Sequence, residues 1–208
     1  IQSLKGICEY PVNEYGTWAE CPLARMPYYA KGNNPLPAAQ APEEMAKHKA
    51  LSCKALEETE HVVIRVHHLL CIICYAGRED NSTPLAEDNL MEAWKKFREN
   101  PDILVTVVEG PQQCCICPPC HSYNRERGLC VAGCHLRDRK KDLDTCVAIG
   151  VNPGETYTAR ALYKRIHEKI KDIRLICGYE TDTSPEWVSC SSVGSGLYNR
   201  GLEACRIE

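Results

Sequence analysis

The sequence predicts an α+β fold: a small, few-stranded metal-binding domain in which cysteine-bearing loops occupy much of the interior. Two short β-branched runs alternate with longer segments whose apolar residues recur at helical spacing. Fifteen of the 208 residues are cysteines. A chain of this length can bury a core without disulfides, so the thiols indicate a bound metal.

Composition excludes several classes of protein. Hydrophobic residues make up 44% and charged residues 25% of the chain, which argues against disorder. The net charge of −3 excludes a polyanion binder held by bulk charge. No apolar run is long enough to span a membrane. The odd number of cysteines and the adjacent pair Cys114 and Cys115 disfavour a disulfide framework, so a reducing cytoplasm is expected.

The first 58 residues are expected to form an extension that carries three cysteines, and residues 59–208 the domain proper. Residues 27–42 are rich in Pro, Gly and Asn and cannot form regular structure. Pro42 suits the first turn of a helix that runs to about Glu58. The extension is therefore predicted to be mostly irregular and helical, with Cys8, Cys21 and Cys53.

From residue 59 the pattern changes. Residues 62–66 form a β-branched run that ends at His67-His68, and residues 103–108 form a second one, stopped by Gly110. Between them, residues 84–99 carry an apolar stripe at helical spacing. A cysteine-rich loop follows at 114–134.

The C-terminal half is predicted to be helical at first and then loop-like. One helix is expected from about Arg137 to Ile149, with Gly150 as its C-cap. Another is expected to start near Thr156 or Thr158 and to place Leu162, Ile166, Ile170 and Ile173 on one face. The tail from Cys177 is expected to be a loop.

Cysteine spacing in the loop indicates a thiolate metal site. Cys114, Cys117 and Cys120 are separated by two residues each, as at the start of a bacterial ferredoxin run, but the next cysteine, Cys130, follows only after nine residues. Iron–sulfur is favoured, and zinc remains an alternative. Cys117, Cys120, Cys130 and Cys134 could make a tetrahedral four-cysteine site, with a basic rim over residues 125–141. Few aromatic residues accompany that rim, so a solvated face is preferred to contact with nucleic acid.

Two histidines and a cysteine near the end of the first β-branched run each have a functional and a structural interpretation. His67 and His68 point to opposite faces if the strand continues, and the one that faces Cys71 is either a ligand, a donor to sulfide or a proton carrier, or a buried histidine that shapes the turn. Cys74 lies on the same face as Cys71 if a helix follows, as a second ligand or a core residue. Cys146 is expected to pack in the core.

Several of these motifs together resemble a known family. The run His67-His68-Leu69-Leu70-Cys71, the later Gly110 with Cys114, Cys117 and Pro118, and the closing segment with Cys177, Trp187 and Gly201 are similar to the small prokaryotic domain of unknown function 1284, described as an iron–sulfur protein. The resemblance covers roughly residues 62–205.

The resemblance implies one site made of Cys71, Cys114, Cys117 and Cys130, and a second group around Cys177 and Cys190. Several cysteines are additional to the family pattern, namely Cys74, Cys115, Cys120, Cys134, Cys146 and those of the extension, and the tail spacing Cys177, Cys190, Cys205 is wider. We therefore expect two or more iron–sulfur clusters of the [4Fe–4S] type.

The predicted function is electron transfer, as an accessory subunit or domain of a larger redox complex in an anaerobe. Clusters held by short loops pass electrons by proximity, which suits a chain without catalytic motifs. Two alternatives stay open: an iron–sulfur enzyme with an open iron site beside His67 or His68, and a zinc-stabilised module that binds protein or RNA. The sequence names no substrate.

Overall fold

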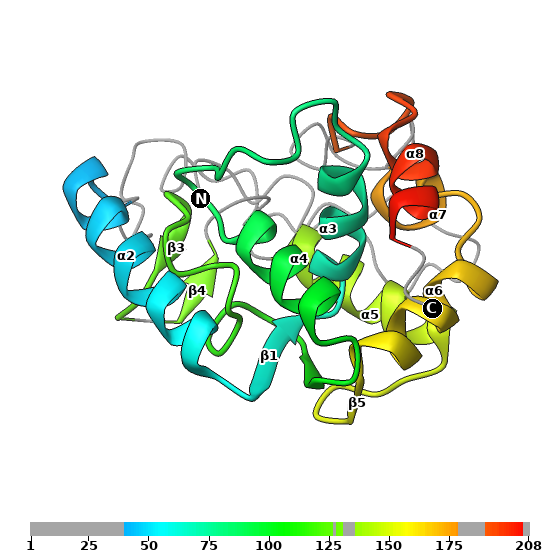
Figure 1. Cartoon of the computed structure of the whole chain (residues 1–208), viewed down its shortest axis with the longest axis horizontal. Coiled ribbons are helices and arrows are strands. Elements are labelled where there is room, and N and C mark those ends of the chain that lie inside the picture. Colours follow the sequence, from blue (N-terminus) through cyan, green and yellow to red (C-terminus); the bar gives the residue numbers. More distant parts are fainter. Residues whose placement is uncertain (1–39, 127, 131–135, 179–189, 206–208) are drawn as a thin grey trace, which may run out of the picture.

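The computed structural model describes residues 40–126, 128–130, 136–178 and 190–205. Within these ranges the chain is a mixed fold of helices with few strands, as predicted (Figure 1). The helices are α2 (Pro42–Glu58), α3 (His68–Ala76), α4 (Leu90–Glu99), α5 (Leu136–Ile149), α6 (Ala159–Lys169), α7 (Arg174–Cys177) and α8 (Leu197–Ala204). The strands are β1 (His61–Arg65), β2 (Leu104–Val108), β3 (Tyr123–Asn124), β4 (Leu129–Cys130) and β5 (Thr156–Thr158).

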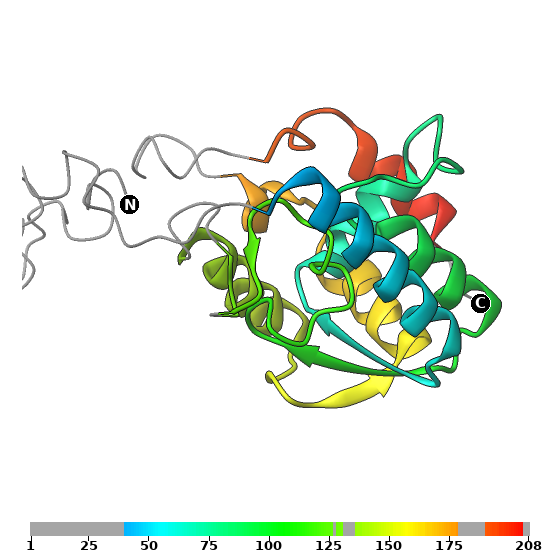
Figure 2. The same cartoon turned by 90° about the vertical axis from the view of Figure 1, so that its left-hand side faces the viewer.

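A three-stranded sheet forms the base of the fold. β1 and β2 are parallel, with Arg65 opposite Val108, and β5 pairs with β2 in the antiparallel sense. β3 and β4 form a separate hairpin. Helices α3, α4 and α6 lie on one side of the sheet (Figure 2). Alternate side chains of β1 and β2 are accordingly buried toward them, namely Val62, Ile64, Val105 and Val107.

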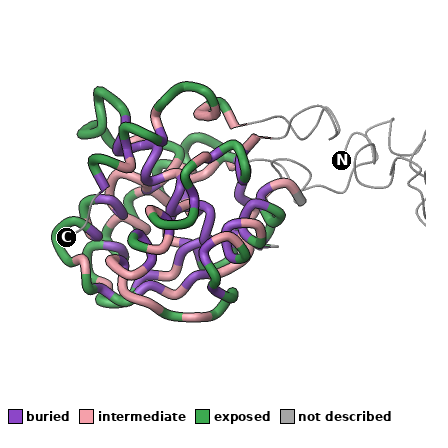
Figure 3. The backbone as a smooth tube through the Cα atoms, turned by 90° about the vertical axis from the view of Figure 1, so that its right-hand side faces the viewer, coloured by how far each residue is buried: buried purple, intermediate pink, exposed green. Residues whose placement is uncertain are grey.

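The helical stripes expected from the sequence form the core. Ala93, Trp94 and Phe97 of α4 are buried, and so are the four predicted residues in and after α6. Figure 3 shows buried and exposed stretches alternating along the backbone of the described residues. The Thr158 hydroxyl accepts a hydrogen bond from the amide of Ala161 at 3.2 Å and so caps the start of α6. The predicted helix from 84 begins later, at Leu90, whose amide is held by the Asp88 carboxylate.

Helix α2 has the predicted bounds and packs against α4. Lys49 pairs with Glu92 at 2.6 Å, and Leu56 is buried between the helices and the rest of the core. At its start, the Gln40 amide donates to the carbonyls of Pro118 and Cys120. The segment just before this helix is therefore bonded to the cysteine loop.

The expectation of a loop-like tail is wrong for residues 197–204, which form α8. Two glycines explain why this helix packs so closely on α3. A methyl group at Gly201 would lie 1.7 Å from the carbonyl oxygen of Ile73, and one at Gly77 would lie 2.0 Å from that of Leu197. Glycine usually counts against a helix, but here it permits backbone contact between two helices. No helix in the described ranges is both long and apolar enough to cross a membrane.

Candidate metal centre

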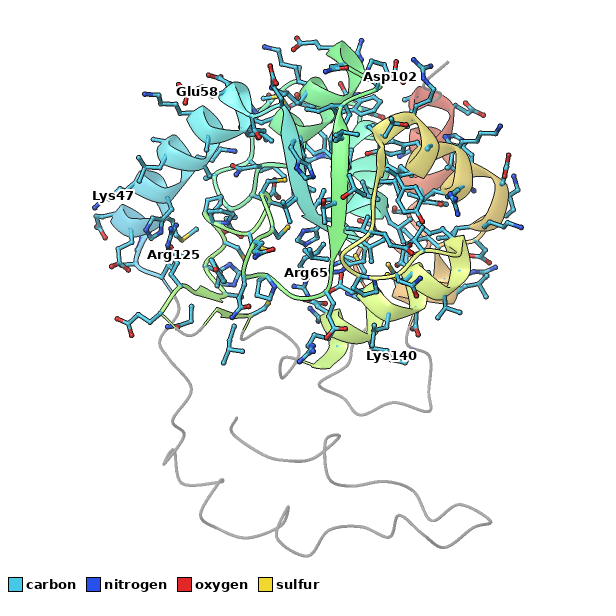
Figure 4. The ribbon with its side chains drawn as sticks, turned by 90° about the horizontal axis from the view of Figure 1, so that it is seen from below. Lys47, Glu58, Arg65, Asp102, Arg125 and Lys140 are labelled. Atoms are coloured by element: carbon cyan, nitrogen blue, oxygen red, sulfur yellow. The ribbon has the colours of Figure 1, made fainter. Side chains whose placement is uncertain are left out.

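Chemically active side chains gather where β1 and β2 end. Parallel neighbours end at the same edge of a sheet, so the segments that follow them meet there. His68 is the first residue of α3, three residues after β1, and Cys114 and Cys117 lie in the loop after β2. Figure 4 shows Arg65 at this edge, between that loop and α5.

His68, Cys114 and Cys117 form a compact group, called here the histidine–thiol group. The His68 Nδ1 atom lies 3.2 Å from the Cys114 sulfur. The three ligand atoms all lie within 4.8 Å of one another. Both cysteines are buried, and His68 is half-buried. Imidazole nitrogen and thiolate sulfur are the donors that zinc and iron prefer in proteins.

Backbone hydrogen bonds hold the loop against the edge of β1. The Arg65 amide donates to the Cys114 sulfur at 3.3 Å, and the Cys115 amide donates to the Val63 carbonyl at 2.9 Å. The Asn89 side chain donates to the Cys115 carbonyl at 2.7 Å. The position of Cys114 is therefore set by β1, and that of the next residue also by Asn89, which precedes α4.

The environment favours a thiolate at Cys114. Burial alone would raise its pKa, but hydrogen bonds from the Cys115 and Cys117 thiols and the nearby His68 lower it well below the usual range. The pKa values of Cys115 and Cys117 are raised in turn, because each donates to Cys114. One buried thiolate is thus surrounded by donors, an arrangement that suits a metal ligand.

A buried carboxylate on α5 accepts hydrogen bonds from residues at the ends of β1 and β2. Asp142 is fully buried and accepts from Arg65 Nε at 2.9 Å, from His67 Nδ1 at 2.6 Å and from the Gly110 amide at 3.0 Å. Burial would raise the pKa of Asp142, but His67 and Arg65 lower it below its usual value. Burial lowers the pKa of His67 to about 4, so at neutral pH the ring is uncharged and donates to Asp142.

Two buried polar atoms near the cysteines have no partner. Among the described side chains, the buried nitrogen and oxygen atoms without a hydrogen bond are Arg65 Nη2, Glu92 Oε2 and the Tyr163 hydroxyl. Burial alone would lower the pKa of Arg65, but the charges of Asp142 and Cys117 raise it. Burial raises the pKa of the Tyr163 hydroxyl, and the charges of Cys205, Cys115 and Cys71 raise it further. Buried polar groups are rarely left unpaired, so these two donors suggest an anionic group among the thiols.

Four further cysteines share a pocket of about 420 Å³, called here the four-thiol pocket. Cys71 and Cys74 lie one turn apart on α3, so the predicted helical spacing is confirmed. Cys177 ends α7, and the Cys190 amide donates to its carbonyl at 3.0 Å. Leucines and an isoleucine line the rest of the pocket, together with Tyr75, Arg78, Asp88 and two serines.

Three of the pocket thiols, Cys71, Cys74 and Cys177, have raised pKa values. Burial raises the pKa of Cys71 well above its usual value, and the charges of Cys177, Cys190 and Cys74 raise it further. Burial and the same neighbours raise the pKa of Cys74 to about 12. Lys141 acts in the opposite sense on Cys71 and Cys177. A bound cation would reverse this repulsion, because it favours the thiolate of every cysteine that it touches.

The structure places the other predicted ligands around or away from these two groups. The charge of Cys130, at the end of β4, is one of the smaller causes that raise the pKa values of Cys117 and Cys120. Cys53 of α2 contacts Asn89, which precedes α4, and Glu92 of α4. Cys205 is buried at the end of α8, and Cys146 is buried in the core, as expected. All twelve described cysteines are free thiols. Cys8, Cys21 and Cys134 lie outside the described residues.

Sequence reasoning missed the polar residues that support the site. Arg65 stands in a β-branched run, and Asp142 and Lys141 stand in a charged stretch that was interpreted as a solvated helix face. All three are buried. An arginine at the end of an otherwise apolar strand, with a helical aspartate further along the chain, is the available signal for a buried ion pair.

Comparisons with protein-family models, with curated proteins and with solved structures gave no match for this chain. The resemblance to the domain of unknown function 1284 therefore stays a prediction. So do the ligand sets that it implies.

Proposed function

We propose that this protein binds an iron–sulfur cluster in the four-thiol pocket and transfers electrons as part of a larger redox complex. The observation that carries the proposal is the convergence of Cys71, Cys74, Cys177 and Cys190 on one pocket of about 420 Å³. Four thiolates are the usual ligand set of a [4Fe–4S] cluster.

The spread of the pocket sulfurs fits a cluster better than a single ion. Within the described residues, the one group of three ligand atoms lying within 4.8 Å of one another is the histidine–thiol group, so the pocket sulfurs are more widely separated. Thiolates on a cluster bind different irons, so they lie further apart than the ligands of a single ion. When bound, an iron–sulfur cluster supplies one-electron transfer at a potential set by its surroundings.

The chain's own residues would control access and charge. Leu85, Leu90, Ile173 and Leu197 give part of the pocket wall an apolar surface. Lys141 is buried near Cys71 and Cys177 and offsets negative charge there, while the Ser192 hydroxyl donates to Cys74. Cys71 and Cys190 are only half-buried. A group held by them lies near the surface, where a redox partner can exchange electrons with it.

The proposal is tested on the full chain, purified and reconstituted with iron and sulfide without oxygen. We expect about equal iron and acid-labile sulfide, and a visible absorption that bleaches with dithionite. Cys177→Ser should lose most of both. Cys146→Ser is the matched control, because Cys146 is equally buried but lies in the core on α5. Equal iron and sulfide in the two variants, or none in the unaltered chain, would refute the proposal.

A further inference from the structure

The histidine–thiol group differs in geometry from the four-thiol pocket. For one tetrahedral zinc ion, metal–sulfur and metal–nitrogen bonds of about 2.3 and 2.1 Å place the ligand atoms about 3.6–3.8 Å apart. The ligand atoms of His68, Cys114 and Cys117 lie within 4.8 Å of one another, with one pair at 3.2 Å. The group is therefore already close to the dimensions of a site for a single ion.

The scaffold that holds these ligands is stiff. Cys114 accepts from the Arg65 amide at the end of β1, and the neighbouring Cys115 amide is bonded to Val63 of the same strand. Cys117 is held in a turn by the bond from the Cys120 amide to its carbonyl at 2.9 Å. Ligands fixed by sheet backbone need little rearrangement to bind an ion, which favours affinity.

The unpaired arginine nitrogen is a second, independent indication. Arg65 is 1% exposed, its Nε atom is bonded to Asp142, and its Nη2 atom has no partner. Arg65 lies beside the site, because its own amide donates to the Cys114 sulfur at 3.3 Å. A metal-bound thiolate is anionic and accepts hydrogen bonds well, whereas a protonated thiol accepts them poorly. A metal on Cys117 would therefore give Nη2 the acceptor that it lacks.

We propose that His68, Cys114 and Cys117 form a separate site for one divalent zinc-class ion, distinct from the pocket cluster. The ion joins the start of α3 to the loop after β2. Arg65 acts as a positioning residue that donates to the Cys117 thiolate. The site does not depend on the proposed electron-transfer function, because none of its three ligands lines the four-thiol pocket.

The test uses Co²⁺ as a spectroscopic substitute for Zn²⁺ in the full, reduced, iron-free chain. Cys74→Ser with Cys177→Ser removes two pocket thiols from the titration. This double variant should still bind a single Co²⁺ with a thiolate-to-cobalt absorption band, and Zn²⁺ should displace it. Adding His68→Gln or Cys117→Ser should weaken Co²⁺ binding at least tenfold, whereas adding Cys146→Ser should change it less than twofold.

Thermal unfolding distinguishes a variant that has lost a metal ligand from one that fails to fold. Zn²⁺ should raise the melting temperature of the double variant but not that of its Cys117→Ser derivative, with similar circular dichroism for both before metal is added. Loss of Co²⁺ binding in the double variant, or unchanged binding after His68→Gln, overturns the inference. Either result leaves the pocket proposal standing, because that proposal is tested by iron and sulfide.

Discussion

Removing the hydroxyl of Tyr163 should make the protein more stable. The side chain is 1% exposed, and its hydroxyl has no hydrogen-bond partner among the described residues. A buried polar group without a partner costs about 1–3 kcal/mol. Tyr163→Phe deletes that group and keeps the ring, whose edge-to-face contacts with Trp94 and Phe97 have centroid separations of 6.4 and 6.1 Å.

The expected gain in unfolding free energy is about 1–2 kcal/mol, because loss of the oxygen also leaves a small void. For a chain of this size each kcal/mol moves the melting temperature by about 2–4 °C. The assay is thermal and urea unfolding of the reduced chain before metal is added.

Tyr198→Phe is the matched control. Tyr198 is equally buried, but its hydroxyl donates to the Ile170 carbonyl at 2.9 Å. This variant should lose about 1 kcal/mol. If Tyr163→Phe destabilises the chain as much as Tyr198→Phe does, the Tyr163 hydroxyl has a partner and the reasoning fails.

The remaining predictions concern the buried ion pair and the helix contact. Asp142→Asn leaves Arg65 buried without its counter-charge and should cost about 3–5 kcal/mol in urea unfolding. Because the folded pKa of Asp142 is below its unfolded value, its carboxylate stabilises the fold above about pH 4, and this contribution falls as the pH drops through the folded pKa. The unfolding free energy, measured as the pH is lowered, should fall less in Asp142→Asn than in the unaltered chain. The same dependence on pH in both proteins would contradict the lowered pKa of Asp142. Gly201→Ala should separate α3 from α8 and destabilise the fold by about 2 kcal/mol, which lowers the melting temperature by more than about 5 °C. Glu203→Ala, on the exposed face of α8, is the control and should leave the melting temperature unchanged. Equal melting temperatures for the two variants would contradict the close packing.

Much of the fold was predictable because its elements carry strong local patterns. The stripe of α4, the face of α6 and the β-branched runs of β1 and β2 all follow from apolar spacing. α8 was not predictable in this way, because Gly201 has low helix propensity and its role depends on contact with a helix far away in the sequence. The three-residue β5 is defined only by its pairing with β2.

The candidate site was predictable in its residue types but not in its grouping. Cysteine spacing predicted Cys114 and Cys117 as ligands and placed Cys74 with Cys71. The sequence could not show that His68 joins the loop cysteines while Cys71 faces Cys177, since this depends on how α3 leaves the sheet. Nor could it show that Arg65 is buried beside them, because spacing carries no information about which charges pair across the fold.

The measurement that tests the account most directly is the amount of iron, acid-labile sulfide and zinc per chain in protein purified without oxygen, for the unaltered chain and for Cys177→Ser. The account expects iron and sulfide in about equal amounts in the unaltered chain, both lost in Cys177→Ser, with zinc retained in each. Zinc without sulfide in the unaltered chain, or iron and sulfide unchanged in Cys177→Ser, would contradict a cluster in the four-thiol pocket.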